Sequence, residues 1–423
     1  MRYAHVYRGR ASGGVEQYLR HLDRGLLHRH RLTVLQMHLV RDDADHAIEV
    51  ESVGVGRILW IPVPIRQTGS RLTDFPGRIA HICRTFRRDR QAGGGRSGAI
   101  LSFLQNLFGD HCGHLRYKAA IFSGHLQRFL AEQEVDLLAL HWLSYDTGAL
   151  AACARKAEVP FVFINHFDNA RLSSPQVRRR IADAAAIGAI SNCGIPADLR
   201  ARCVNLSDAV DTEFFTPAKA RPVPITAPSV VLLPARIEAG KGHRDLIEAA
   251  RILIARKCDL TIALVGAVDS ESLYQELRQS VSAMGLEKQV LFLGEKTAEE
   301  IRDWYAISSI VVLPSHSEGL GRVLLEAQAM KKPVVAYDCG GVREAVLPDE
   351  TGFLLEPENV EALADKIGLL LENEGKRVRM GERGREFVSH RFSVSALIQR
   401  HEALYVSALS AAGQKPNRAL ASQ

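Results

Sequence analysis

Residues 310–326 read IVVLPSHSEGLGRVLLE, and this stretch decides how the surrounding chain folds. Its first four residues form a short, continuous apolar run, which is typical of a strand that is buried on both faces. A polar loop with glycines at 319 and 321 follows, and a helical pattern begins at Val323. A strand, a glycine-containing loop and a helix in this order are typical of a doubly wound sheet, which binds ligands beyond the carboxyl ends of its strands.

The same alternation of apolar runs and helical patterns extends along most of the chain. The predicted strands lie at 3–7, 32–35, 136–140, 160–164 and 186–190, and then at 230–233, 260–265, 290–293, 310–313 and 333–336. Between the two series lie Pro217, Pro222, Pro224 and Pro228, which predict a linker because proline ends regular structure. We therefore expect an α/β protein with two Rossmann-like, doubly wound domains that face each other across a cleft.

The predicted domains are one Rossmann-like domain at 1–216 and a second at 217–390. A final helix at 391–410 is expected to return to the first domain, and 411–423 is expected to be a flexible tail. The sequence has no apolar run of the roughly 18 residues that a membrane-spanning helix needs. Its charged first ten residues do not resemble a secretory signal.

The seven cysteines are dispersed and include no Cys-x-x-Cys pair, which favours free thiols in a reducing compartment over disulfides or a zinc site. We therefore expect a cytoplasmic protein. Between Arg66 and Arg96, eight arginines occur with only two acidic residues. Such a segment can bind the inner face of an anionic membrane or an anionic acceptor, but a solvated helix face explains it equally well. No aromatic–basic pattern points to nucleic acid.

The loop after the strand at 310–313 carries the strongest signal of chemistry. Gly319 and Gly321 allow a phosphate to approach the backbone, and the start of the next helix offers unpaired N–H groups. Glu318 and Glu326 flank this point and could hold hydroxyl groups on either side of a phosphate. Glutamates on a helix are usually only solvated, but Glu326 lies in an apolar stretch where an unpaired carboxylate would be costly.

The pattern Pro-Ser-x-x-Glu-Gly-x-Gly-x-x-x-x-Glu-Ala at 314–327 resembles the signature of the family 4 glycosyltransferases, which have the GT-B fold. Further similarity lies at Gly13-Gly14-Val15-Glu16, at Arg236 with Lys241-Gly242, and at 338–344. The resemblance is close from 204 to 390 and absent from 40 to 130. One departure is Asp208-Ala209-Val210-Asp211, where the family has Asn-Gly-Val-Asp.

The resemblance implies a retaining transfer of sugar from a nucleotide-sugar co-substrate to a glycan or lipid-linked acceptor, in polysaccharide or glycolipid biosynthesis. It implies that the domain at 1–216 lies on the acceptor side and that the domain at 217–390 binds the nucleotide-sugar. It implies neither a metal ion nor another cofactor. The implied catalytic residues are His166, Glu318, Arg236 and Lys241, with the two cations gripping the departing phosphate. The implied nucleotide-sugar-binding residues are Gly14, Gly294, Glu295, Gly319, Leu320, Gly321, Arg322 and Glu326.

Several alternatives remain open at this point. A lone histidine is more often structural than catalytic, and this applies to His166 and more strongly to His141. Asp43-Ala44-Asp45 has the form of a metal-binding motif, although a surface loop explains it better. The chain could also be a GT-B-type epimerase or hydrolase, or a non-catalytic nucleotide-sugar-binding or scaffold subunit. A nicotinamide dehydrogenase is disfavoured because the first loop lacks Gly-x-Gly-x-x-Gly spacing.

Overall fold

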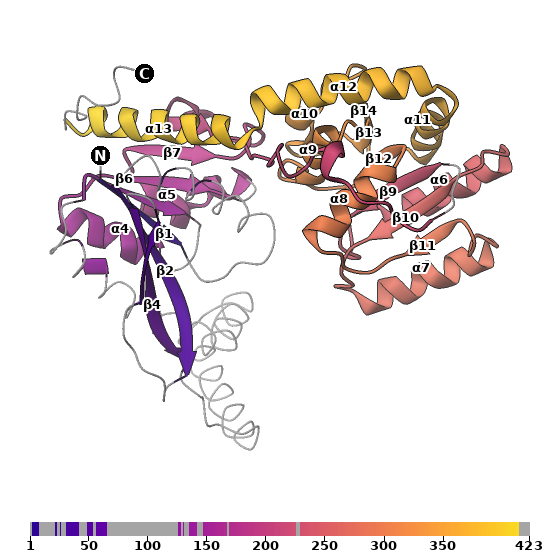
Figure 1. Ribbon diagram of the computed structural model, residues 1–423. Coiled ribbons are helices and arrows are strands. Elements are labelled where there is room, and N and C mark those ends of the chain that lie inside the picture. Colours follow the sequence, from indigo (N-terminus) through magenta and orange to yellow (C-terminus); the bar gives the residue numbers. More distant parts are fainter. Residues whose placement is uncertain are drawn as a thin grey trace, which may run out of the picture.

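The computed structural model describes residues 2–7, 22, 26, 31–41, 49–53, 56–65, 126–127, 130, 135–141, 147–166, 169–225 and 229–413. The described strands form two sheets, which lie in separate lobes of the molecule (Figure 1). Gly14, Asp43-Ala44-Asp45, the segment Arg66–Arg96 and residues 414–423 lie outside the described residues. The predictions made for them therefore stay predictions.

The N-terminal lobe is built on a sheet with the order β3-β4-β2-β1-β5-β6-β7-β8. All neighbouring strands are parallel except β3 and β4, which are antiparallel. The strands are β1 (Arg2–Tyr7), β2 (Arg31–Arg41), β3 (Glu49–Val53), β4 (Gly56–Ile65), β5 (Leu137–His141), β6 (Phe161–Asn165), β7 (Ala186–Ala189) and β8 (Cys203–Asn205). The helices α4 (Thr147–Lys156) and α5 (Pro175–Ile181) and the 3-10 helices η2 (Asn169–Ser173) and η3 (Ala197–Arg202) connect the later strands.

The C-terminal lobe contains a parallel sheet with the order β11-β10-β9-β12-β13-β14. Its strands are β9 (Val230–Pro234), β10 (Thr261–Val265), β11 (Val290–Phe292), β12 (Ile310–Leu313), β13 (Val334–Tyr337) and β14 (Gly352–Leu355). β9, β10, β12 and β13 consist of buried, mostly apolar residues along their whole length, which suits strands covered by helices on both faces. In β11 only Val290 is buried. The strand order reverses between β9 and β12, which is where a doubly wound sheet binds its ligand.

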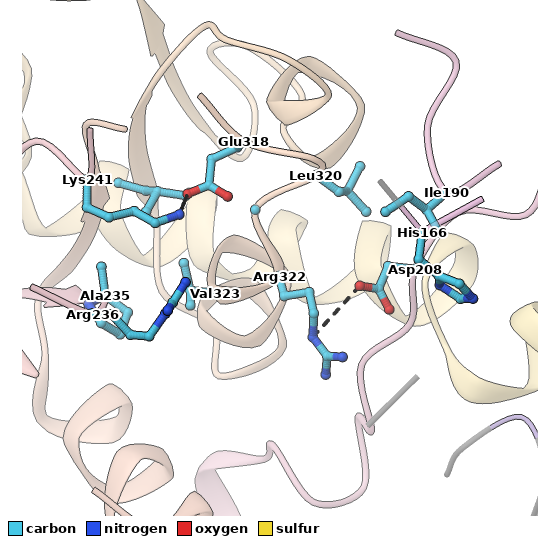
Figure 2. Close-up of a pocket in the computed structure, with 13 residues that line it drawn as sticks. His166, Ile190, Asp208, Ala235, Arg236, Lys241, Glu318, Leu320, Arg322 and Val323 are labelled. Carbon is cyan, nitrogen blue, oxygen red and sulfur yellow. Dashed lines mark hydrogen bonds and ion pairs between the residues drawn. The ribbon is translucent and has the colours of Figure 1, made fainter. Parts of the chain in front are cut away.

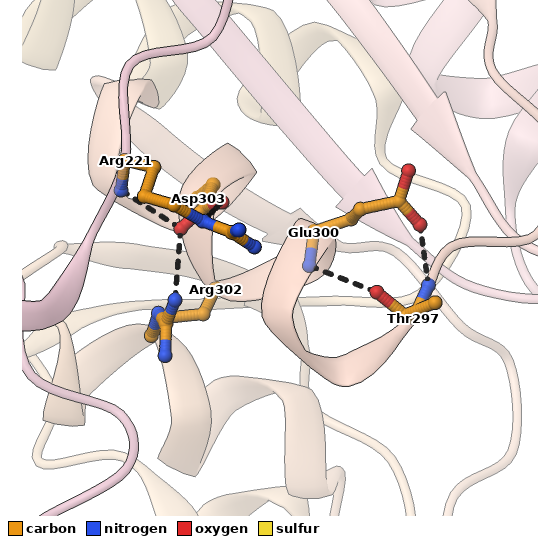
Figure 3. Close-up of polar contacts among 5 residues, drawn as sticks. All are labelled: Arg221, Thr297, Glu300, Arg302 and Asp303. Carbon is orange, nitrogen blue, oxygen red and sulfur yellow. Dashed lines mark hydrogen bonds and ion pairs between the residues drawn. The ribbon is translucent and has the colours of Figure 1, made fainter.

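Helices cover both faces of this second sheet (Figure 1). They are α6 (His243–Ala255), α7 (Glu271–Ala283), α8 (Ala298–Ile307), α9 (Arg322–Ala329), α10 (Val342–Ala345), α11 (Val360–Glu372) and α12 (Glu374–Arg391). The start of α8 is fixed by a capping box, in which Thr297 and Glu300 each bind the other's backbone N–H (Figure 3). No helix in the described ranges is both long and apolar enough to cross a bilayer.

The last helix, α13 (Val394–Ala411), lies against the N-terminal sheet although it follows the C-terminal lobe in the chain (Figure 1). It contacts β6 and β7, and Leu397 and Leu404 belong to the same buried cluster as Leu137 and Val162. The N-terminal lobe therefore needs residues from both ends of the sequence to complete its core.

Within the described residues the chain crosses between the lobes twice, and the two crossings are hydrogen-bonded to each other. The backbone N–H of Val210 donates to the carbonyl of Phe392 over 2.8 Å. Arg385 of α12 donates to the carbonyls of Thr212 and Phe215, at 2.7 and 2.6 Å. These bonds tie the first crossing to the second.

The linker that continues from the first crossing is attached to the C-terminal lobe through α8 (Figure 3). Arg221 donates to the carboxylate of Asp303 from its backbone N–H at 3.0 Å and from its Nε at 3.2 Å. The same carboxylate accepts a hydrogen bond from Arg302, whose guanidinium lies 5.0 Å from the ring centroid of Phe214. These bonds hold the linker at Arg221 to the C-terminal lobe, so the two crossings lie before Arg221 and at Phe392.

Candidate active site

A cavity of about 360 Å³ lies between the lobes, at the point where the strand order of the C-terminal sheet reverses (Figure 2). The N-terminal lobe contributes His166, Ile190 and Asp208 to its wall. The ends of β9 and β12 and the start of α9 form the opposite wall. The cavity brings together seven of the predicted residues, namely His166, Arg236, Lys241, Glu318, Leu320, Gly321 and Arg322.

Other predicted residues lie outside the lining of this cavity. Gly319 belongs to the same loop, and Glu326 lies one turn further along α9 than Arg322. Gly294 and Glu295 follow β11, whose carboxyl end lies at the same edge of the sheet as that of β12 because the strands are parallel.

The loop before α9 requires glycine for conformational reasons. Gly321 has a φ of 79° and caps the helix that begins at Arg322. A β-carbon there would lie 3.1 Å from the side chains of Leu313 and Leu324 as well as being strained. Helix α9 therefore begins at the cavity wall, and the N–H groups of its first turn can bind an anion there.

Lys241 and Glu318 form a close pair in the cavity (Figure 2). The Nζ of Lys241 donates to Oε1 of Glu318 over 2.7 Å, and both side chains are largely buried. The position of Lys241 is fixed by Gly242, where a β-carbon would lie 1.9 Å from the carbonyl oxygen of Pro314. An anion that bound Lys241 would release Glu318 to accept hydrogen bonds from another group.

Arg236 lies at the rim of the cavity and is more exposed than Lys241. Its guanidinium donates to Glu238 at 3.0 Å and also pairs with Asp269. Because these are exposed ion pairs, they contribute little to stability and can be exchanged for a bound anion at small cost.

Arg322 faces two buried carboxylates. Its Nε lies 3.8 Å from Asp208 of the N-terminal lobe, and one of its terminal nitrogens lies 3.9 Å from Glu326. Burial raises the pKa of both carboxyl groups, and the Arg322 charge partly offsets this rise. The hydroxyl of Tyr305 in α8 also donates to Glu326, over 2.9 Å. Glu326 is therefore a hydrogen-bonded carboxylate rather than an unpaired one.

His166 follows β6 and is buried, with 7% of its surface exposed. Burial lowers the pKa of His166 to about 4, so the ring is neutral near neutral pH. Its Nε2 lies 3.1 Å from Nδ1 of His141 at the end of β5. One of these two nitrogens must carry the proton that the other accepts, so the tautomers of the two rings are coupled.

The pair formed by His141 and His166 packs against the C-terminal helix α13. The ring of His401 in α13 stacks on that of His141, with 6.2 Å between centroids. His401 in turn shares a hydrogen bond of 2.9 Å with the hydroxyl of Tyr405. The helix that completes the N-terminal core thus also orients the side chains behind the cavity.

Sequence reasoning missed three residues that shape this site: Asp208, Tyr305 and His401. In the sequence, Asp208 was noted only because it stands where the family has the Asn of Asn-Gly-Val-Asp. Tyr305 and His401 gave no signal, because a buried aromatic residue on a helix has the same local pattern whether or not it binds another functional group.

The chain has clear relatives among known proteins. Residues 217–387 match the family model described as glycosyl transferases group 1. The D-inositol 3-phosphate glycosyltransferase of Xylanimonas cellulosilytica is 30% identical over 285 residues, which cover 60% of this chain and 67% of the relative. The chain belongs to the group 1 glycosyl transferases.

Two further comparisons extend over most of this group 1 glycosyl transferase. The D-inositol 3-phosphate glycosyltransferase of Corynebacterium urealyticum is 26% identical over 375 residues, covering 80% of this chain and 88% of the relative. The structure of Anabaena HepE in complex with UDP matches with a TM-score of 0.65 and 19% identity, covering 96% of this chain and 100% of HepE. The predicted GT-B fold with two Rossmann-like domains is thereby confirmed, as is the predicted class of enzyme.

Proposed function

We propose that this group 1 glycosyl transferase is a retaining, metal-independent enzyme of family 4. In this proposal it transfers a sugar from a nucleotide-sugar to a glycan or lipid-linked acceptor in polysaccharide or glycolipid biosynthesis. The observation that carries the proposal is the cavity itself, where Arg236, Lys241, Arg322 and the start of α9 converge from the C-terminal lobe. Such a set suits a diphosphate, whose negative charge grows as the sugar leaves.

We propose that the nucleotide-sugar donor binds in this cavity. We place its diphosphate at the N–H groups of Leu320, Gly321 and Arg322, with Lys241 and Arg236 beside it. Lys241 then exchanges Glu318 for phosphate, and Glu318 becomes free to accept hydrogen bonds from the sugar. Glu326 accepts those of the ribose.

We place the base near Gly294 and Glu295, at the carboxyl end of β11. The binding energy of these remote groups can orient the sugar for reaction. UDP, the ligand of HepE, is the first nucleotide to test.

The N-terminal lobe supplies the opposite side of the reacting centre. His166 is neutral because of its lowered pKa, so it can hydrogen-bond the donor sugar without adding a charge. We propose that the acceptor hydroxyl attacks from the face that the nucleotide leaves, which retains the anomeric configuration. The three cations and the helix start stabilise the leaving diphosphate, which is the role that a metal ion has in other transferases. Contact between the lobes limits access of water, which would otherwise compete with the acceptor.

The binding of donor can be tested by thermal-shift measurements with UDP-, GDP-, ADP-, dTDP- and CMP-sugars in the presence of a metal chelator. A ligand at a hundredfold excess over its Kd stabilises by about 2.7 kcal/mol. We expect one nucleotide class to stabilise the protein, and we expect Glu326→Ala to abolish the shift. Glu361→Ala, an exposed position in the first turn of α11, is the matched control and should retain it. Absence of any shift, or a shift only with added metal, would contradict the proposal.

The stereochemistry is tested by following the anomeric proton of the product by NMR. Retention is expected in the first-formed product, and inversion would refute the mechanism proposed here.

We further propose that the enzyme acts in the cytoplasm, at the inner face of the membrane, where the segment Arg66–Arg96 binds anionic lipid. Binding to vesicles of anionic phospholipid should be lost when Arg84, Arg87 and Arg88 are all replaced by Glu. Equal binding of the wild type and the variant, or no binding by either, would refute this part.

A further inference from the structure

Glu344 of α10 connects the two lobes through three hydrogen bonds. Its Oε1 accepts from the hydroxyl of Ser191 at 2.8 Å and from the backbone N–H of Asn192 at 2.6 Å. Its Oε2 accepts from Nδ2 of Asn205 at 2.7 Å. All three donors belong to the N-terminal lobe, whereas Glu344 belongs to the C-terminal lobe. A single carboxylate therefore uses both of its oxygens across the boundary between the lobes.

On the C-terminal side, Glu344 is coupled to the loop that carries Glu318. The backbone N–H of Gly341, just before α10, donates to the carbonyl of Glu318 over 3.3 Å. A β-carbon at Gly340 would lie 1.9 Å from the carbonyl oxygen of Glu318, and one at Gly341 would lie 2.0 Å from that of Gly319. The backbone before Glu344 thus packs directly against the loop at Glu318, so the two cannot shift independently.

On the N-terminal side, a chain of buried hydrogen bonds leads from the same carboxylate toward His166. The carbonyl of Ser191 accepts from Nδ2 of Asn169 at 2.7 Å. The Oδ1 of Asn169 accepts from Nδ2 of Asn165 at 2.9 Å. Asn165 is the last residue of β6 and immediately precedes His166. Ser191, Asn169 and Asn165 are all nearly inaccessible to solvent, so water does not compete for these bonds.

The two halves of this network meet at the cavity wall. Ile190, next to Ser191, lies beside Gly319, with 3.7 Å between its Cδ1 and the place of a β-carbon at Gly319. The carboxylate of Glu344 therefore has its partners only while the lobes are in this arrangement. If the lobes separate, water must replace all three donors.

We propose that Glu344 is a positioning residue that holds the lobes in register, so that His166 faces Glu318 across the donor cavity. The proposal rests on the proposed function, because a transferase needs both lobes at the sugar and needs water kept away from it. Hydrogen bonds of this kind are strong when made, because the acceptor is charged, and yet they can be exchanged for water during each cycle of opening.

The pair of Glu344 and Asn205 allows a test in which the direction of one hydrogen bond is reversed. In Glu344→Gln, Oε1 still accepts from Ser191 and Asn192, but Nε2 faces the Nδ2 donor of Asn205. Asn205 cannot turn its amide without loss, because its Oδ1 accepts from the backbone N–H of Ser207 at 2.8 Å. In Asn205→Asp, two carboxylates face each other. In the double variant, the new amide donates to the new carboxylate, and every bond is restored.

Each single variant is expected to lower the kcat of transfer by about ten- to a hundredfold, the range that corresponds to losing a hydrogen bond to a charged group. The KM for the donor should change little, and the fraction of donor lost to hydrolysis should rise. Small-angle scattering of the free protein should show a larger radius of gyration in both single variants. The double variant should recover the radius and most of the kcat. Glu382→Gln, an exposed position on α12, is the control for loss of a charge.

The proposal is overturned if the single variants keep the wild-type radius and product ratio, or if the double variant is no better than the worse single variant. Failure of the proposed function gives a different result. In that case the wild type transfers no sugar, whereas the scattering comparison needs no substrate and still decides whether Glu344 holds the lobes together.

Discussion

Replacing Tyr305 with Phe is expected to destabilise the C-terminal lobe, and to do so more strongly at high pH. The tyrosine ring is fully buried, and its hydroxyl donates to the carboxylate of Glu326 over 2.9 Å. Phenylalanine fills the same space but leaves Glu326 without this donor. Burial already raises the pKa of Glu326, and the hydrogen bond from Tyr305 counteracts part of the rise. The substitution should therefore raise the pKa of Glu326 further.

The sign of the pH dependence follows from the raised pKa. Consider a carboxyl group whose pKa is higher in the folded state than in the unfolded state. At a pH where both states are protonated, this difference does not change the free energy of unfolding. As the pH rises through the folded pKa, the difference lowers the free energy of unfolding. Loss of a hydrogen bond to a charged acceptor costs about 1.5–3 kcal/mol, and to a neutral one about 0.5–1.5 kcal/mol. For Tyr305→Phe, we expect the free energy of unfolding to fall by an amount in the upper of these two ranges at high pH and in the lower range in acid. A loss of 2 kcal/mol corresponds to a decrease in Tm of about 4–8 °C for a lobe of this size.

The assay is urea unfolding, followed by circular dichroism, of the wild type and Tyr305→Phe at about pH 8 and about pH 5. Tyr274→Phe is the matched control, since its hydroxyl is bonded to Arg278 at an exposed site. The control should change the free energy of unfolding by less than about 0.5 kcal/mol at either pH. A loss for Tyr305→Phe that is the same at both pH values, or no larger than that of the control, would refute the role of Glu326 as a buried charged acceptor.

Three further predictions concern His166, which lines the cavity, and two residues packed behind its walls, Gly340 and His141. Gly340→Ala should weaken nucleotide binding at least tenfold by calorimetry, because the new β-carbon would collide with the carbonyl oxygen of Glu318. His141→Ala should lower kcat by about ten- to a hundredfold in a transfer assay, whereas His141→Asn, whose amide can replace Nδ1, should retain most activity. Because the pKa of His166 is lowered from 6.5 to about 4, the protein should lose about 3 kcal/mol of stability as pH falls through this interval, since the unfolded chain takes up the proton first. His166→Asn should remove that share of the pH dependence measured by unfolding.

Each of these predictions has a control within the chain. Gly240→Ala introduces similar backbone strain, with a φ of 87°, but has open space around the new atom. It should leave nucleotide binding intact, and equal losses in both glycine variants would attribute the effect to strain alone. Equal activity of the two His141 variants would show that the hydrogen bond to His166 has no part in the reaction. His390→Asn, at an exposed position, should leave the pH dependence of stability as it is in the wild type.

The sequence alone was sufficient for most of the fold. The strands from β5 to β7 and from β9 to β13 lie close to their predicted positions, because strands buried in a parallel sheet appear as short, continuous apolar runs. The antiparallel pair of β3 and β4 was not predicted, and it falls in a region whose pattern is irregular. β8 was missed because it is only three residues long and lacks a buried apolar run: Cys203 and Asn205 are partly buried, and Val204 is exposed.

The sequence also determined the loop at the centre of the site. Gly319, Gly321, Glu318 and the start of α9 are consecutive or nearly so, and their order along the chain fixes their order in space. A short motif of this kind is encoded locally, because strand, turn and helix each depend on residues only a few positions apart.

Only the tertiary structure decided which partners those residues have. Tyr305 and Glu326 are 21 residues apart, and Asn205 and Glu344 are 139 residues apart. His401 reaches the histidine pair because α13 returns across the lobe boundary to complete the N-terminal core. The spacing of apolar residues specifies which face of a helix is buried, but not which side chain of another element it meets. That choice depends on how the two sheets and the returning helix pack together, and this packing arises only when the whole chain is folded.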